Sequence, residues 1–179
     1  MKTSKLTILF IVWGSVTLNV VKAQGQMAAA RVMEYIVQKD ITVNATMNDV
    51  WKQISDIKEL PKYSGGFISA VNDDGKPEEF LFTLKDGTQR KGKVDIMNPE
   101  GGTPAFCVIN VVSPFPDSIT LVMLVLRVKE GDSPNTANIR WAASIDGTDK
   151  AKNELKQQLA AEFDSYIIGL SKFFQVKQQ

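Results

Sequence analysis

The most regular hydrophobic pattern in this chain lies between residues 148 and 177. Apolar residues recur there at intervals of three and four positions, which places them on one face of an α-helix. The stretch contains no Pro, and its only Gly, Gly169, lies near the end. Asp146-Gly147-Thr148 supplies turn and capping residues just before it. We therefore predict one long helix, whose apolar stripe consists of Leu155, Leu159, Phe163, Tyr166, Ile167, Leu170, Phe173 and Phe174.

Alternating apolar and polar residues predict β-strands through much of the preceding chain. Residues 31–43 are predicted to form one long first strand. The sequence Lys85-Asp86-Gly87 indicates a tight hairpin between two of the later strands. These later strands are expected at residues 67–71, 79–84, 88–94 with a continuation to 97, 105–113, 119–129 and 137–145.

Two short helices are predicted between the first strand and the others. The first covers residues 49–56 and turns Val50, Trp51 and Ile54 inward, and the second covers residues 57–63. The long helix has a wide apolar face that needs a large apolar partner, and the strands provide one. We predict an α+β fold in which a curved antiparallel sheet of about six or seven strands wraps around the long C-terminal helix.

The N-terminal segment has the pattern of a secretory signal peptide. A short basic region is followed by an apolar run from residue 6 to 21, and Val21-Lys22-Ala23 places small residues where a signal peptidase acts. A retained membrane anchor is the alternative, but the run is shorter than the ~20 residues that a bilayer span needs. We therefore expect a signal peptide at 1–23, a flexible leader at 24–30, a domain at 31–179, and a protein exported to the periplasm or secreted, without a stable membrane anchor after cleavage.

Charge and composition exclude several classes of function. Cleavage removes three of the 21 Lys and Arg residues and leaves 18 against 20 Asp and Glu, a net charge of about −2 that argues against a nucleic-acid partner. The chain has no His, which excludes His-based catalysis and most zinc and copper sites. Asp49, Asp56 and Glu59 suit capping and surface roles better than metal binding, so we expect no metal and no cofactor.

Several segments resemble the SRPBCC superfamily of helix-grip proteins, which includes START domains, plant pathogenesis-related proteins and polyketide cyclases. Residues 41–56, Ile-Thr-Val-Asn-Ala-Thr-Met-Asn-Asp-Val-Trp-Lys-Gln-Ile-Ser-Asp, are similar to the family's opening strand, turn and helix. Residues 59–63 and 139–141 resemble its Leu-Pro-Lys-aromatic segment and its last strand with Trp. In the family a Gly-rich strand usually follows the short helices, and this chain departs from that pattern with Asp-Asp-Gly-Lys-Pro at residues 73–77. The rival lipocalin fold is disfavoured because its Gly-x-Trp signature is missing.

The resemblance implies a cavity between the sheet and the long helix that takes apolar ligands. Such a site needs a concave, mostly apolar wall with a few polar groups for orientation. The alternative is a closed core that the same side chains fill. The expected wall residues are Trp51, Phe67, Phe80, Phe82, Met97, Met123, Trp141, Phe163, Tyr166, Ile167 and Leu170, with Phe106 or Cys107 beside them.

Few residues suggest catalysis, and we predict no catalytic residue. Cys107 lies in an apolar strand and is expected to be a buried thiol without a base to activate it. The strand charges Arg90, Asp95, Arg127 and Arg140 are interpreted as solvent-facing and paired across the sheet. The alternative for one of them is a cavity Arg that binds a ligand carboxylate.

The leading functional hypothesis is an exported, non-catalytic binding protein for a hydrophobic small molecule or lipid. The alternatives are a polyketide cyclase or dehydratase-like enzyme that uses the same cavity, and an interaction module with a filled core. The sequence also allows a homodimer, because residues 119–128 are apolar on both alternating faces. In that hypothesis Leu124 lies at the centre of an outward contact.

Overall fold

A computed structural model describes residues 34–97, 105–115 and 117–175. They belong to one compact unit, residues 33–179. The predicted signal peptide at 1–23 and the leader at 24–30 lie outside the described residues, and so does the beginning of the predicted first strand. Within the described part of the chain, no helix combines the length and apolar character needed to cross a membrane.

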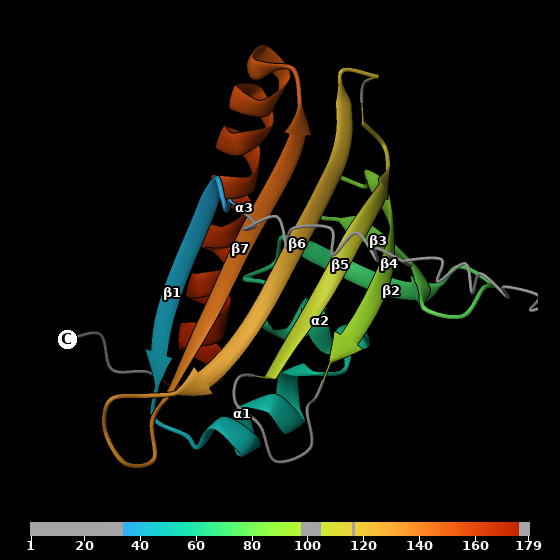
Figure 1. The fold of residues 1–179 in the computed structure, drawn as a ribbon. Coiled ribbons are helices and arrows are strands. Elements are labelled where there is room, and N and C mark those ends of the chain that lie inside the picture. Colours follow the sequence, from blue (N-terminus) through green and yellow to red (C-terminus); the bar gives the residue numbers. More distant parts are fainter. Residues whose placement is uncertain (1–33, 98–104, 116, 176–179) are drawn as a thin grey trace, which may run out of the picture. The chain divides into compact units, whose positions relative to one another are not determined.

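Seven antiparallel strands form one open, curved sheet (Figure 1). The first strand pairs with the seventh, which is the strand farthest from it in sequence and directly precedes the long helix. The spatial order is β1-β7-β6-β5-β4-β3-β2. The strands are β1 (Val37–Val43), β2 (Ile68–Asp73), β3 (Glu79–Leu84), β4 (Gln89–Met97), β5 (Ala105–Ser113), β6 (Ile119–Glu130) and β7 (Ala137–Gly147).

Three short helical segments follow β1, and one long helix ends the described chain. Thr46 caps the first of them by accepting a hydrogen bond from the Asp49 backbone N–H at 3.2 Å. The long helix α3 lies along the sheet beside β1 and β7 (Figure 1). This is the predicted α+β helix-grip arrangement. The segments are α1 (Met47–Ile54), η1 (Ile57–Glu59), α2 (Leu60–Tyr63) and α3 (Asp149–Phe173).

Two predicted elements differ from the structure at their ends. The described strand β1 begins at Val37 rather than at residue 31, although the Ile36 N–H still donates to the Ala143 carbonyl at 2.9 Å. At the end of α3, Phe173 is 36% exposed and Ile167 is half-buried. The last turn contacts α2, where the Phe173 ring lies 6.0 Å from that of Tyr63, so the sheet covers less of the stripe than predicted.

The two faces of β6 are the reverse of the predicted assignment. Val122, Leu124, Leu126 and Val128 belong to the buried core cluster, whereas Met123 and Val125 lie on the opposite face of the strand. The prediction that Leu124 points outward is wrong. A register shift between Ile119 and Leu121 also separates these two residues, so that Ile119 joins the core while Leu121 is 44% exposed.

Candidate functional site

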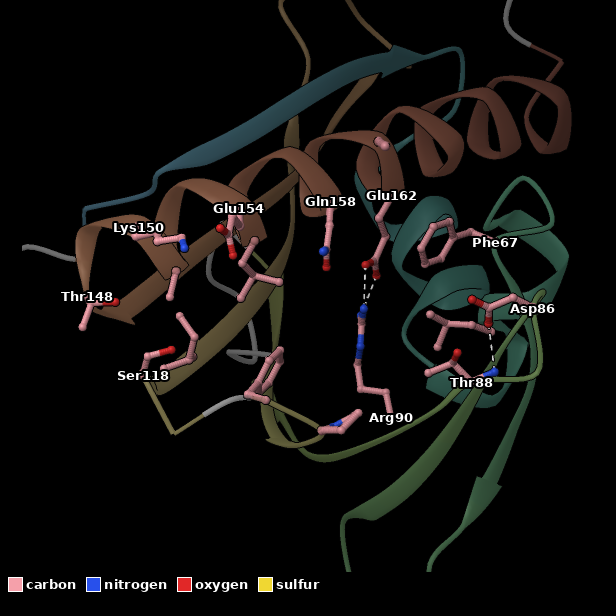
Figure 2. A pocket seen from close by; sticks show the side chains of 17 residues that line it. Phe67, Asp86, Thr88, Arg90, Ser118, Thr148, Lys150, Glu154, Gln158 and Glu162 are labelled. Carbon is pink, nitrogen blue, oxygen red and sulfur yellow. Dashed lines mark hydrogen bonds and ion pairs between the residues drawn. The ribbon is translucent and has the colours of Figure 1, made fainter.

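A pocket of about 850 Å³ opens between the first half of α3, the β3–β4 hairpin and the β5–β6 connection. Its volume falls within the range of roughly 300–1,000 Å³ that is usual for small-molecule sites. Figure 2 shows the lining side chains converging from these elements. They are Phe67, Leu84, Asp86, Thr88, Arg90, Pro114, Phe115, Ser118, Ile119, Thr148, Lys150, Ala151, Glu154, Leu155, Gln158, Ala161 and Glu162.

The pocket wall combines an apolar surface with polar groups along α3. Phe115, Ile119 and Leu155 supply apolar surface from the β5–β6 connection, β6 and α3. Leu84 at the end of β3 also lines the pocket, and Phe67 supplies apolar surface at the end near Asp86 (Figure 2). One turn of α3 separates Lys150 from Glu154, Glu154 from Gln158 and Gln158 from Glu162, so these polar side chains form one row. A wall of this kind can hold an apolar molecule and orient it by a few polar contacts.

Arg90 and Glu162 form an ion pair in the middle of this pocket (Figure 2). The guanidinium of Arg90 on β4 donates two parallel hydrogen bonds to the Glu162 carboxylate on α3, Nη1 to Oε1 at 2.8 Å and Nη2 to Oε2 at 2.9 Å. The side chain of Arg90 is 13% exposed and that of Glu162 only 1%. The Tyr166 hydroxyl donates a third hydrogen bond to Oε1 at 2.5 Å. Glu162 is therefore buried with both oxygens paired, as a buried charge requires.

Burial and the neighbouring charges set the charge states of Arg90 and Tyr166 at neutral pH. Burial alone would lower the pKa of Arg90. The charge and hydrogen bonds of the adjacent Glu162 carboxylate outweigh burial, so the net shift of this pKa is upward. Burial and then the charge of Glu162 raise the pKa of Tyr166 well above its ordinary value. Arg90 is thus a cation and Tyr166 a neutral phenol near pH 7, so neither is available as a general base.

Among the predicted wall residues whose side chains the structure describes, only Phe67 lines this pocket. Trp141, Phe163 and Tyr166 instead pack against one another, with ring centroids 4.8 to 6.0 Å apart, and Leu170 is equally buried. Phe67 touches this cluster edge-on at Tyr166, with the centroids 6.0 Å apart. These large side chains fill the space between sheet and helix, which is what the closed-core alternative expected of them.

The other predicted wall residues are dispersed over the fold. Phe82 is buried on β3, Phe80 is half-buried with Lys58 Nζ 6.0 Å from its ring centre, and Ile167 is half-buried on α3. Trp51 lines a separate depression of about 340 Å³ beside α1. Met123 is buried on β6 but does not belong to the core cluster, and Met97 ends β4 with a side chain outside the described part.

The sequence interpretation of the strand charges is wrong for Arg90 and confirmed for Arg140. Arg140 on β7 donates from Nε to Oδ1 of Asp40 on the neighbouring strand β1, at 2.6 Å, which is the predicted cross-strand pair. Arg90 instead enters the pocket, and the carboxylate that it holds belongs to this chain. Glu162 was missed, although one signal identifies it. It stands three residues after Leu159 and four before Tyr166, so an acid occupies the apolar stripe of the helix.

The described residues offer little for metal or nucleophilic chemistry. They contain no group of three His, Cys, Asp or Glu side chains that could hold a metal ion. Cys107 is buried, and burial, with a smaller effect from Asp95, raises the pKa of its thiol to about 12. Such a thiol carries almost no thiolate at neutral pH and is a poor nucleophile.

Comparison with known proteins identifies the fold through solved structures alone. The sequence matches no family model and none of the curated proteins. A START superfamily protein from Mycobacterium smegmatis has a similar structure with a TM-score of 0.55 and 13% identity, over 78% of this chain and 96% of that chain. Norcoclaurine synthase from Thalictrum flavum, in complex with dopamine and hydroxybenzaldehyde, gives 0.60 and 15%, over 80% and 88%.

A third similar structure is BexL, a di-domain ARO/CYC protein from the BE-7585A biosynthetic pathway. It gives a TM-score of 0.61 with 12% identity over 75% of this chain and 44% of that chain. At identities this low the similarity concerns the fold. The resemblance to SRPBCC helix-grip proteins that the sequence predicted is confirmed at that level.

Proposed function

We propose that this protein binds a hydrophobic small molecule or lipid, without catalysis, in the pocket between α3 and the sheet. The observation that carries the proposal is the pocket itself, with its volume of about 850 Å³ and its apolar wall residues. The bound molecule would lie along Phe115, Ile119 and Leu155 and reach Arg90 with a polar group. Proteins of similar fold support the same use, since the norcoclaurine synthase structure holds two small aromatic molecules.

The second candidate is an enzyme of the cyclase type, and the Arg90–Glu162–Tyr166 cluster is the observation in its favour. Buried titratable groups beside a pocket are typical of active sites. The hydrogen bonds argue against catalysis, because both oxygens of Glu162 are paired and the Tyr166 hydroxyl already donates its hydrogen bond to one of them. A group that must abstract a proton needs a free lone pair near the substrate. We therefore place binding ahead of catalysis.

The proposal is tested by titrating the purified protein with N-phenyl-1-naphthylamine, an uncharged dye that fluoresces in apolar surroundings. We expect saturable binding at one site. Ala161→Phe adds a ring at an exposed position that lines the pocket. It should lower the affinity for the dye by about tenfold, the equivalent of displacing one buried apolar group.

Asn153→Phe is the matched control for this titration. It adds the same ring at another exposed position of α3 that does not line the pocket, and binding should stay unchanged. Dye binding that never saturates, or that weakens equally in both variants, would contradict the proposal.

We also propose that the protein is exported and that it forms a homodimer. The segment 1–23 supports export, and the N-terminal sequence of secreted protein should then begin at Gln24. Recovery of the uncleaved chain in membranes would contradict it.

A homodimer is supported by two exposed apolar side chains on adjacent strands, Val112 at 60% and Leu121 at 44% exposure.

A further inference from the structure

We infer that the pocket selects uncharged ligands that carry a hydrogen-bond acceptor, such as a ketone or ester oxygen, and that Glu162 excludes carboxylates. This inference rests on the proposed function and specifies its ligand class. Glu162 would act as a specificity-determining residue, because it occupies with its own carboxylate the place at Arg90 that a ligand carboxylate would take.

The donors of Arg90 define what a ligand can offer. A guanidinium has five N–H groups, and the two hydrogen bonds to Glu162 use two of them. The described residues supply no acceptor for the other three, and the side chain keeps 13% of its surface exposed in the pocket. An acceptor oxygen on a ligand would satisfy donors that only water can satisfy in the empty pocket.

The charges around the pocket decide which acceptor is favoured. Glu162 already neutralises Arg90, and a ligand carboxylate would leave the buried site with one uncompensated negative charge. Among the described residues of the lining, three carboxylates (Asp86, Glu154 and Glu162) face two cations (Arg90 and Lys150). A carboxylate entering this pocket would therefore lose its hydration without gaining a free countercharge. A neutral carbonyl oxygen avoids this cost and still accepts from Arg90.

The ion pair also has the geometry of a fixed element rather than a mobile one. It joins β4 to α3 by two parallel bonds, and Tyr166 holds the same carboxylate from within the helix. A bidentate guanidinium–carboxylate pair has a defined orientation. A ligand carboxylate that took the two-bond position on Arg90 would have to displace Glu162 from both partners and leave it buried and unpaired. One that used the remaining N–H groups of Arg90 would bring a second negative charge beside Glu162.

The inference is tested with two probes of equal chain length, 2-decanone and decanoate, each competing with the naphthylamine dye at pH 7.5. In the wild-type protein we expect 2-decanone to bind about tenfold or more tightly than decanoate, the effect of one unpaired buried charge or its lost hydrogen bonds. Glu162→Gln removes the negative charge and keeps an oxygen for Tyr166. This variant should bind decanoate about tenfold or more tightly than the wild type does, and 2-decanone about as before.

The double variant Arg90→Gln/Glu162→Gln is the control for the charge of Arg90. It should lose the gain in decanoate affinity that Glu162→Gln alone produces. Equal or tighter binding of decanoate in the wild type would overturn the inference, and so would an unchanged preference in a folded Glu162→Gln variant. If that variant does not fold, the wild-type comparison decides alone. Failure of both probes and of the dye to bind would instead contradict the proposed function.

Discussion

Glu162 shows how one buried residue can determine the chemistry of a pocket. An acid on the apolar face of a helix is tolerated only when its charge is matched and its oxygens are hydrogen-bonded. Arg90 and Tyr166 meet both needs from different elements. The result is a neutral, polar centre in a pocket with apolar wall residues, which suits binding of a molecule with a single acceptor group.

The Phe163 side chain belongs to the core rather than to the pocket, and this makes its removal costly. It is fully buried against Trp141 and Tyr166. Phe163→Ala should lower the free energy of unfolding by about 3–5 kcal/mol, measured by urea titration. Phe173→Ala is the control on the same helix, and its partly exposed ring should cost far less. A near-zero effect at Phe163 would show that its ring is not packed.

The Cys107 thiol should resist modification in the folded protein. Its pKa of about 12 leaves roughly one thiolate in ten thousand at pH 8. Ellman's reagent should therefore react slowly until urea unfolds the chain. Rapid labelling of the native protein would show that the strand opens or that the thiol is accessible.

The same pKa predicts how stability changes in alkali. The unfolded thiol ionises near 9 and the folded one near 12, so the unfolded state loses its proton first. Stability should be fully retained below pH 9 and fall as pH rises towards 12, by roughly 1 kcal/mol between pH 8 and 9.5. Cys107→Ala should lose this part of the pH dependence, as urea midpoints at the two pH values would reveal.

Among the elements, α2 and α3 approach each other through glycines. A Cβ at Gly169 would lie 2.2 Å from the Tyr63 carbonyl oxygen and from the Gly65 backbone nitrogen, both main-chain atoms that a side-chain movement cannot clear. The Ser165 hydroxyl reinforces the contact by donating to the Ser64 carbonyl at 3.1 Å. This contact holds the α2 region, and Phe67 after it, against the helix beside the pocket.

Gly169→Ala should therefore destabilise the protein although Ala favours helices. Overpacking at a closed contact typically costs about 1–3 kcal/mol, more than the gain in helix propensity of about 1 kcal/mol. Ile168→Ala, at an exposed neighbouring position, is the control and should change the urea midpoint little. A stabilised Gly169→Ala protein would show that the two helices can separate without penalty.

At the scale of the whole molecule, the two faces of β6 predict opposite mutational effects. Leu124→Glu places a charge in the core and should abolish cooperative folding. Leu121→Glu changes an exposed position on the other face and should leave the fold intact, as circular dichroism would show. If the proposed homodimer uses Val112 and Leu121, light scattering should give a smaller particle for Leu121→Glu than for the wild type. A wild-type protein that is monomeric at high micromolar concentration would contradict the dimer.

Local patterns predicted the helices and strands well, because each element follows from the spacing of apolar residues within its own segment. Strands β3 and β5 have the predicted bounds, and α3 lies within the predicted helix. The face of β6 could not be derived in the same way, because both of its faces are apolar and a register shift after Ile119 changes the alternation.

The pocket was largely missed because it depends on the distance between elements far apart in sequence. The aromatic residues expected at its wall, such as Trp141 and Phe163, fill the core where sheet and helix are close. The wall forms where α3 lies opposite the hairpin and the β5–β6 connection, and it uses smaller or polar side chains such as Ala151, Thr88 and Gln158. No local period distinguishes these from ordinary surface residues.

The most direct test of the account is to locate a bound molecule by methyl NMR during a titration with 2-decanone. We expect saturable shifts for the methyl groups of Leu84, Ile119 and Leu155, which line the pocket. The methyl groups of Val112 and Leu121 on the outer face should not move. Shifts confined to that outer face, or no saturable shift at the pocket with any uncharged apolar probe, would contradict the claim that this pocket is a binding site.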